Sequence, residues 1–338
     1  SGVANTGKIA YYDPTDGLFH AMGTGAAGGD VTRLAIGVNG VLYAGGGFTS
    51  MGGVANTAGL AQWNGSAWSA LGTGPSGGVV AALVVDPSGN LYAGGSFTSM
   101  GGIANTSQIA KWSGSAWSSV TGGGAANNTV NALTVTANGT IYAGGQFTSI
   151  GGVAATRVAS WNGTTWAALG TGMNNTVNGL AVAPNCQIYA IGQFTTAGGV
   201  TVGFCAVWNG IAWAALSTGF DALANSVTIS PDGTAWFAGS FTTAGGVVLR
   251  SRITQWNGTV FVTSDNNLVS SSTAQTIAFD AAGNMYVGYS SFGTANQAGL
   301  TTISNPGTAR SYPTITIYGP SSGTARIYEI VNPTTNRA

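Results

Sequence analysis

Residues 142–166 read YAGGQFTSIGGVAATRVASWNGTTW, and both halves of this stretch recur along the chain. The first half has the pattern Tyr-Ala-Gly-Gly-x-Phe-Thr, and its phenylalanine returns in steps of 47 to 51 residues: Phe48, Phe97, Phe147, Phe194, Phe241 and Phe292. The second half has the pattern Trp-Asn-Gly-x-x-Trp, which returns at 63–68, 112–117, 161–166, 208–213 and 256–261, and in disguised form at 9–19. Six copies of a unit of about 49 residues predict a repeat architecture.

One period of the repeat contains four short segments with the composition of β-strands: 130–135, 141–147, 157–161 and 166–169. Asn138 and Gly139 separate the first two segments, and Asn162 and Gly163 separate the last two. Asn-Gly between apolar stretches is a strong signal for a tight hairpin turn, and a longer Gly-rich loop joins the second segment to the third. Four antiparallel strands in such a period are typical of a propeller blade.

The phase of the repeat predicts how the ring closes. Residues 1–22 supply only the third and fourth strands of a blade, called c and d, and residues 274–292 supply only the first and second, called a and b. Five complete blades lie between them, and joining the two halves makes a sixth and removes the free sheet edges. The sequence therefore predicts an all-β fold, a closed six-bladed β-propeller over residues 1–292, followed by a β-hairpin segment over 293–338.

Composition supports an ordered chain and excludes two classes of partner. Glycine makes up 56 of the 338 residues and charged residues only 5 %, yet 33 residues are Phe, Trp or Tyr, which disordered chains lack. The formal net charge is zero and no basic cluster is present, so we expect no nucleic-acid binding. No apolar run approaches the roughly 20 residues of a membrane span, so we expect no membrane insertion.

Histidine, carboxylate and cysteine residues give no catalytic or metal-binding pattern. His20 is the only histidine, and Asp13 and Asp16 are interpreted as turn residues rather than a calcium loop. The same interpretation holds for the carboxylates at the a–b turns, Asp86, Asp232 and Asp280. Cys186 and Cys205 are expected to be free thiols, with a disulfide as the alternative. The sequence thus predicts no catalytic, cofactor-binding or metal-binding residues, no cofactor, and a protein that is not an enzyme.

The repeated aromatic residues are the candidate site residues, and we assign them a structural role in packing between blades. An array of tryptophans that stacks on sugars is the alternative. The set comprises Trp63, Trp68, Trp112, Trp117, Trp161, Trp166, Trp208, Trp213, Trp256, Phe48, Phe97, Phe147, Phe194 and Phe241.

The unit YAGGxFTSxGGVANTxxIAxWNGSAWSALGTG resembles the propeller repeat of fungal cortical cell-polarity marker proteins, and many bacterial and phage surface proteins carry similar copies. The resemblance extends over residues 1 to about 292. It implies the propeller fold and carries little information about function, because propellers host unrelated activities.

The segment after the repeats is read as a β-hairpin, because residues 314–318 and 325–331 alternate in polarity around a Gly-Pro-Ser-Ser-Gly turn. It looks like the opening of the C-terminal β-sandwich of siphophage distal tail proteins. The residues that match the motifs of that family are Asn305, Gly307, Tyr312, Pro313, Gly319, Asn332, Thr334 and Thr335.

These observations predict a non-enzymatic structural and adhesive component of a phage tail or similar extracellular particle, located on the virion or an extracellular surface. Its partners would be other structural proteins of the particle, with a host-envelope glycan or protein as a further partner. The alternative is a bacterial cell-surface lectin or adhesin that binds neutral glycans. We expect the long loops, nearly free of charge, to make the contact and to do so independently of salt.

Overall fold

A computed structural model describes residues 8–13, 16, 18–120, 125–249, 252–263, 272–280 and 283–289. Every regular element in these ranges is a β-strand, which confirms the all-β fold. The predicted hairpin over 293–338 lies outside the described residues.

Five complete blades are present among the described residues, each a four-stranded antiparallel sheet in which the strands follow one another in chain order. Blade 1 comprises β4 (Val31–Ile36), β5 (Leu42–Gly46), β7 (Leu60–Trp63) and β8 (Trp68–Ser69). Blade 2 comprises β10 (Val80–Val85), β11 (Leu91–Gly95), β13 (Ile109–Trp112) and β14 (Trp117–Ser119). Blade 3 comprises β15 (Val130–Val135), β16 (Ile141–Gly145), β19 (Val158–Trp161) and β20 (Trp166–Ala168).

The last two complete blades have the same order of strands. Blade 4 comprises β21 (Val177–Val182), β22 (Ile188–Gly192), β25 (Cys205–Trp208) and β26 (Trp213–Ala215). Blade 5 comprises β27 (Ala224–Ile229), β28 (Ala235–Gly239), β31 (Ile253–Trp256) and β32 (Phe261–Thr263).

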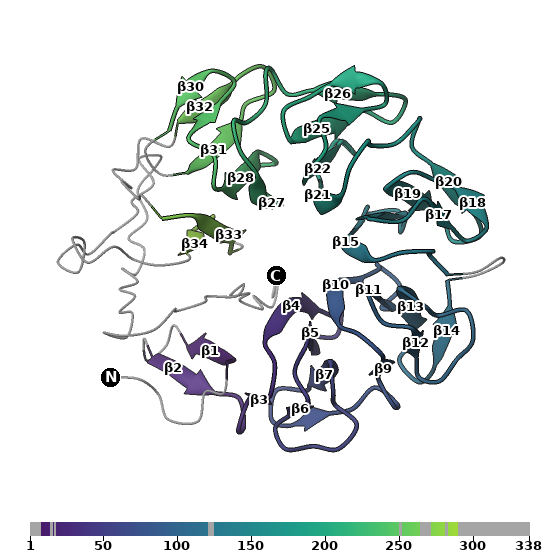
Figure 1. Ribbon diagram of the computed structural model, residues 1–338. Helices are drawn as coiled ribbons and strands as arrows, with labels where there is room; N and C mark the ends of the chain where they lie inside the picture. The colour runs from purple at the N-terminus through teal and green to yellow at the C-terminus, as the bar shows by residue number, and fades with distance from the viewer. Residues whose placement is uncertain are drawn as a thin grey trace.

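The blades stand around a common centre with their first strands innermost (Figure 1). Side chains connect these inner strands across the blades. Thr32 of β4 donates to the Val80 carbonyl of β10 at 3.2 Å, and Asn131 of β15 donates to the Val177 carbonyl of β21 at 3.2 Å. The arrangement is that of a propeller, as the sequence predicts.

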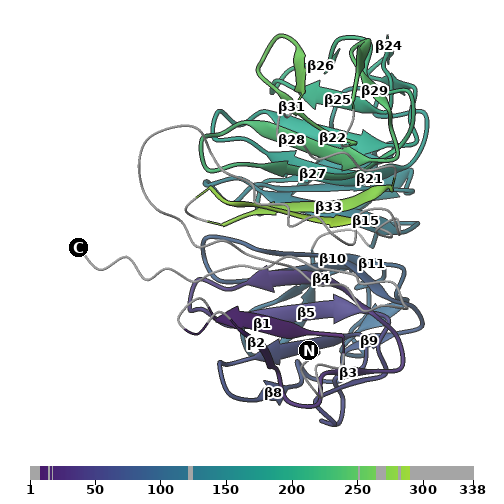
Figure 2. The ribbon, with the colours of Figure 1, turned by 90° about the vertical axis from the view of Figure 1, so that its left-hand side faces the viewer.

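The sixth position of the ring holds two separate hairpins. One consists of β1 (Ala10–Asp13) and β2 (Leu18–Ala21), the other of β33 (Ala274–Phe279) and β34 (Met285–Tyr289). They lie on the same side of the ring, between blade 5 and blade 1 (Figures 1 and 2). Within the described ranges no ladder joins β34 to β1, so the single sheet that would close the ring stays a prediction.

Tryptophan and phenylalanine side chains fill the space between blades. The five phenylalanines of the repeat, from Phe48 to Phe241, are at most 2 % exposed. The second tryptophan of each pair donates its indole N–H to a carbonyl of the preceding repeat, as in the 2.7 Å bond from Trp117 Nε1 to the Leu71 oxygen. The equivalent bonds are Trp68 to Met22, Trp166 to Val120 and Trp213 to Leu169.

Candidate functional site

The ring has two faces that differ in the length of their connections. The connections from strand d to strand a and from strand b to strand c meet on one face, which we call the long-loop face. Short ladders join them, as between β3 (Ala26–Ala27) and β6 (Ser50–Met51) and between β9 (Pro75–Ser76) and β12 (Ser99–Met100). The a–b and c–d turns form the opposite face, which we call the tight-turn face.

The long loops are ordered structures and were not predicted as such. In blades 3, 4 and 5 the b–c loop folds into a two-stranded hairpin: β17 (Ser149–Ile150) with β18 (Val153–Ala154), β23 (Thr196–Ala197) with β24 (Val200–Thr201), and β29 (Thr243–Ala244) with β30 (Val247–Val248). In blade 2 the fully buried Thr106 hydroxyl accepts the Met100 N–H at 2.8 Å and donates to the Ile103 carbonyl at 2.6 Å. Such loops present a fixed surface to a partner.

The loops also pack tightly on the tryptophans. Gly101 has φ +61°, and a Cβ there would lie 2.8 Å from Cδ1 of Trp117. Trp117 itself is 7 % exposed, and its ring centroid lies 5.3 Å from that of Trp112. Because both rings are buried, they contribute to packing and offer no face on which a sugar could stack.

A hollow of about 150 Å³ opens on the long-loop face between blades 1 and 2. Gly47, Phe48, Thr49, Ala58, Gly59, Pro75 and Gly78 line it. Four of these residues are exposed and Pro75 is partly exposed, while Phe48 and Gly59 are buried. The hollow can admit a narrow side chain or a small polar group.

On the tight-turn face, the a–b turns have one geometry in all six repeats, in which the fourth residue donates its N–H to the carbonyl of the first. Asp86 Oδ1 accepts the Ser88 and Asn90 N–H groups at 2.9 Å, which confirms its interpretation as a turn residue. Asp232 and Asp280 likewise accept turn hydrogen bonds. Burial, followed by the negative charge of Asp86, raises the pKa of Tyr92 to about 12, so the phenol stays protonated.

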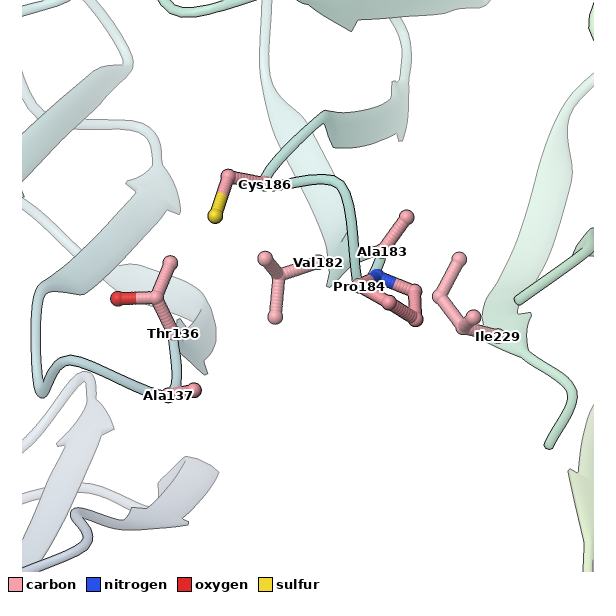
Figure 3. Close-up of a pocket in the computed structure, with 7 residues that line it drawn as sticks. All are labelled: Thr136, Ala137, Val182, Ala183, Pro184, Cys186 and Ile229. Carbon is pink, nitrogen blue, oxygen red and sulfur yellow. The ribbon is translucent and has the colours of Figure 1, made fainter. Parts of the chain in front are cut away.

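A second hollow, of about 230 Å³, lies on the tight-turn face across the turns of blades 3, 4 and 5. It is lined by Thr136, Ala137, Val182, Ala183, Pro184, Cys186 and Ile229 (Figure 3). Cys186 is exposed and Cys205 is buried, and both are free, as expected from the sequence. Burial raises the pKa of the Cys205 thiol, which keeps it protonated. The hollow is apolar apart from Thr136 and the Cys186 thiol.

The structure brings His20 together with Asp13 and Asp16, the pair that the sequence places in one turn. Asp13, Asp16 and His20 offer ligand atoms within 4.8 Å of one another in the β1–β2 hairpin. His20 Nε2 lies 2.8 Å from Asp16 Oδ2, and Asp16 Oδ1 accepts the Leu18 N–H at 2.8 Å. The group is partly exposed, and two oxygens and one nitrogen are a donor set that could hold a cation.

Comparison with known proteins identifies the fold and no family. No protein-family model and no curated sequence matches the chain. Among solved structures, YCF48 bound to a D1 peptide is similar over 78 % of this chain and 77 % of that one, with 12 % identity and a TM-score of 0.50. The WD40 propeller domain of Doa1 is similar over 85 % and 84 %, with 13 % identity and a TM-score of 0.51. In the part of the chain that is described, no helix could span a membrane.

The prediction that the chain is not an enzyme is wrong as stated. Propellers similar to this one include a gluconolactonase from Xanthomonas campestris, with 14 % identity, a TM-score of 0.49 and similarity over 78 % of this chain and 83 % of that one. Catalytic residues of a propeller can come from different blades and then leave no linear motif. The absence of a motif therefore does not decide the enzymatic status of this chain.

Proposed function

We propose that this propeller is a structural and adhesive component of an extracellular particle such as a phage tail, and that its long-loop face contacts a neighbouring protein. The observation that carries the proposal is the construction of that face, where every complete blade presents an ordered loop held to the blade by buried groups. Long loops on a rigid scaffold are where binding sites are usually found.

Three further observations support a protein as the partner. Charged residues make up only 5 % of the chain, which suits a stable contact more than an electrostatically steered one. The tryptophan pairs of blades 2, 3 and 4 are buried and leave no stacking platform for a glycan there. One propeller of the same fold has been solved with a bound peptide. The resemblance of the repeats to phage surface proteins and of residues 298–338 to distal tail proteins supports the particle.

Two isoleucines provide a matched test of the face. Ile103 lies in a b–c loop and is 42 % exposed, while Ile211 lies in a c–d turn and is 86 % exposed. We expect Ile103→Arg to lower incorporation of the protein into particles at least about tenfold, because a charge would be buried in the contact. Ile211→Arg should leave incorporation unchanged, and both variants should keep the wild-type Tm.

Incorporation is measured by quantitative immunoblotting of purified particles from cells that carry each variant. Equal loss with both variants, or loss with Ile211→Arg alone, contradicts the proposal. Protein found only on cell surfaces, with binding competed by a neutral glycan, supports the lectin alternative.

A further inference from the structure

One aligned position has a left-handed backbone conformation in all six repeats; it immediately precedes strand c in blades 1 to 5 and lies two residues before β1 in the first repeat. The residues and their φ angles are Lys8 (67°), Gly59 (70°), Gln108 (60°), Arg157 (70°), Phe204 (61°) and Arg252 (56°). This region is unfavourable for any residue with a Cβ, yet only one of the six is glycine. The side chains at this position therefore have a use that the backbone does not explain.

Three of these side chains are cations, and each donates to loop carbonyls on the long-loop face. Arg157 Nη1 donates to the Gln146 carbonyl, and Arg252 Nη1 donates to the Ser240 carbonyl. Lys8 Nζ donates to the carbonyls of Gly28 and Gly29 of the next repeat, at 2.9 and 3.0 Å. Arg157 and Arg252 thus bond to the b–c loop of their own blade, and Lys8 reaches the loop of the next repeat, so backbone oxygens from both sides accept a basic side chain at this position.

The groove between blades 1 and 2 lacks such a side chain, because its residue at this position is Gly59. The hollow of about 150 Å³ lies at this place. By alignment of the repeats, Gly47 corresponds to Gln146, and Gly77 and Gly78 correspond to Gly28 and Gly29. Within the described residues, no side chain donates to the carbonyls of Gly47, Gly77 or Gly78.

We propose that the groove between blades 1 and 2 binds an arginine side chain of a partner protein. The arginine donates to the Gly47 carbonyl as Arg157 and Arg252 donate to its equivalents, and to the carbonyls of Gly77 and Gly78 as Lys8 donates to theirs. The proposal rests on the proposed function, in which the long-loop face meets a protein. The planar guanidinium carries five donors, enough to reach carbonyls on both walls of the groove. Pro75 and the exposed edge of the loop at Thr49 flank the aliphatic part of the ligand.

The groove recognises the cation through backbone dipoles. Lys8 pairs with Asp30 at 3.1 Å in addition to its carbonyl contacts, whereas Val79 stands at the position of Asp30 in the groove between blades 1 and 2. None of the residues that line the hollow is acidic, so affinity should depend only weakly on salt.

The test is an NMR titration of the intact chain with N-acetyl-arginine methylamide. The neutral control is the citrulline analogue, which has the same length and carries a urea in place of the guanidinium. We expect shifts at the amides of Gly47, Gly59 and Gly78 with a Kd on the order of millimolar, the scale for so small a ligand. The citrulline analogue should bind at least about tenfold more weakly. Equal binding of the two probes, or shifts elsewhere only, overturns the proposal.

Two variants close one groove and open another. A Cβ at Gly59 would lie 2.7 Å from Cγ of Pro75, so an arginine at position 59 needs a smaller residue at position 75. The variant that fills the groove is therefore Gly59→Arg together with Pro75→Ala. Pro75→Ala alone is the control. The double variant should lose the site, and the single variant should keep it. Arg157→Gly should create a second site, seen as new shifts around Gln146. If neither variant changes the number of sites, the inference is wrong.

The outcome is separable from that of the proposed function. If the arginine probe binds at the groove but Ile103→Arg and Ile211→Arg have equal effects on incorporation into particles, the arginine site stands and the proposed contact through the long-loop face is rejected. If the probe does not bind but only Ile103→Arg lowers incorporation, the contact through the long-loop face stands and the arginine site is rejected.

Discussion

Two positions of the repeat share a left-handed backbone conformation but differ in the residue they carry. One is the fourth residue of the a–b turn on the tight-turn face, and the other is the position before strand c on the long-loop face. In the turn, φ lies between 64° and 87°, and five of six repeats have glycine, with Cys186 as the exception. Before strand c, φ lies between 56° and 70°, and five of six repeats have another residue.

The difference shows where backbone geometry alone determines the residue. A Cβ in the left-handed region costs roughly 1–2 kcal/mol, so geometry alone predicts glycine at both positions. The turn follows this rule. The position before strand c departs from it, and there Arg157 and Arg252 donate to loop carbonyls. At this position of the long-loop face the side chain therefore differs from blade to blade while the backbone conformation stays the same.

Both faces depend on the packing between blades, so the largest effect should come from disrupting it. Trp117→Ala removes a side chain that is 7 % exposed and its 2.7 Å bond to Leu71. We expect a loss of roughly 3–5 kcal/mol in the free energy of unfolding, measured by urea denaturation. Ile211→Ala, at a residue that is 86 % exposed, should change it by less than about 0.5 kcal/mol. A small loss for Trp117→Ala would mean that the faces are held separately.

A cross-link between β34 and β1 tests whether the two terminal hairpins form one sheet, so that the sixth blade has the same two faces as the other five. The register of blade 1, in which Ala44 pairs with Ala61, predicts that Val287 pairs with Ala10. In a chain with Cys186→Gly and Cys205→Val, the pair Ala10→Cys and Val287→Cys should form a disulfide on oxidation. The cross-link should raise stability by about 2–4 kcal/mol.

The matched control pairs Ala10→Cys with Val262→Cys on β32 of blade 5, which should stay reduced. Cross-linking in both pairs, assayed by non-reducing electrophoresis, would show that the end of the chain moves freely and that the sheet does not close.

Glycine substitution tests the two left-handed positions directly. Cys186→Gly should stabilise the protein by about 1 kcal/mol, because it removes the Cβ from an unfavourable conformation. Arg157→Gly should give little or no gain, since the relief of strain is offset by the loss of the bond to Gln146. Thermal unfolding of the two variants gives the comparison. An equal gain in both would mean that the arginine contributes nothing to the long-loop face.

The smallest expected effect concerns pH. Burial raises the pKa of Asp221, but hydrogen bonds from the Thr242 hydroxyl and from the Thr243 and Thr242 amides outweigh it, and the pKa is lowered. A carboxylate whose pKa is lower in the folded state contributes stability above its unfolded pKa of about 3.9, and this is lost as pH falls through the folded value.

Wild-type protein should lose stability as the Asp221 carboxylate is protonated in acid, and Asp221→Asn should not show this part of the loss. The difference in the free energy of unfolding should be less than about 1 kcal/mol, since the group is exposed. At pH 7 Asp221→Asn should leave stability nearly unchanged, because Asn127 and Asn174 make the same backbone bonds in other repeats. Urea denaturation at pH 7 and pH 3 measures both values. A large loss at pH 7 would show that the charge itself holds the loop.

Most of the repeat could be predicted from the sequence, because turns and apolar runs leave local signals. The strand Val130–Val135 has the predicted bounds, and the turn at Asn138 and Gly139 is where it was expected. Where the hairpin of β17 and β18 lies, the sequence predicts only a Gly-rich loop, since strands of two residues show no periodicity.

The candidate site depends on features without a local signal. A left-handed φ at Arg157 is not visible in its own repeat and appears only when Gly59 is aligned with it. The approach of His20 to Asp16 depends on the fold of one hairpin, and the hollow beside Cys186 depends on three blades at once. Such convergence is a property of tertiary structure.

The indole bonds between neighbouring repeats have a consequence for how the chain folds. Each spans 44 to 46 residues, and the links between inner strands from Thr32 to Val80 and from Asn131 to Val177 span 48 and 46. The contact order of the five complete blades is therefore set by the length of one repeat, and native contacts can propagate from blade to blade along the chain. Among the strands that the structure describes, only the meeting of β34 with β1 would join segments more than 250 residues apart, where loop-closure entropy is greatest. Assembly of the blades and closure of the ring are then separate kinetic events, with closure the slower of the two.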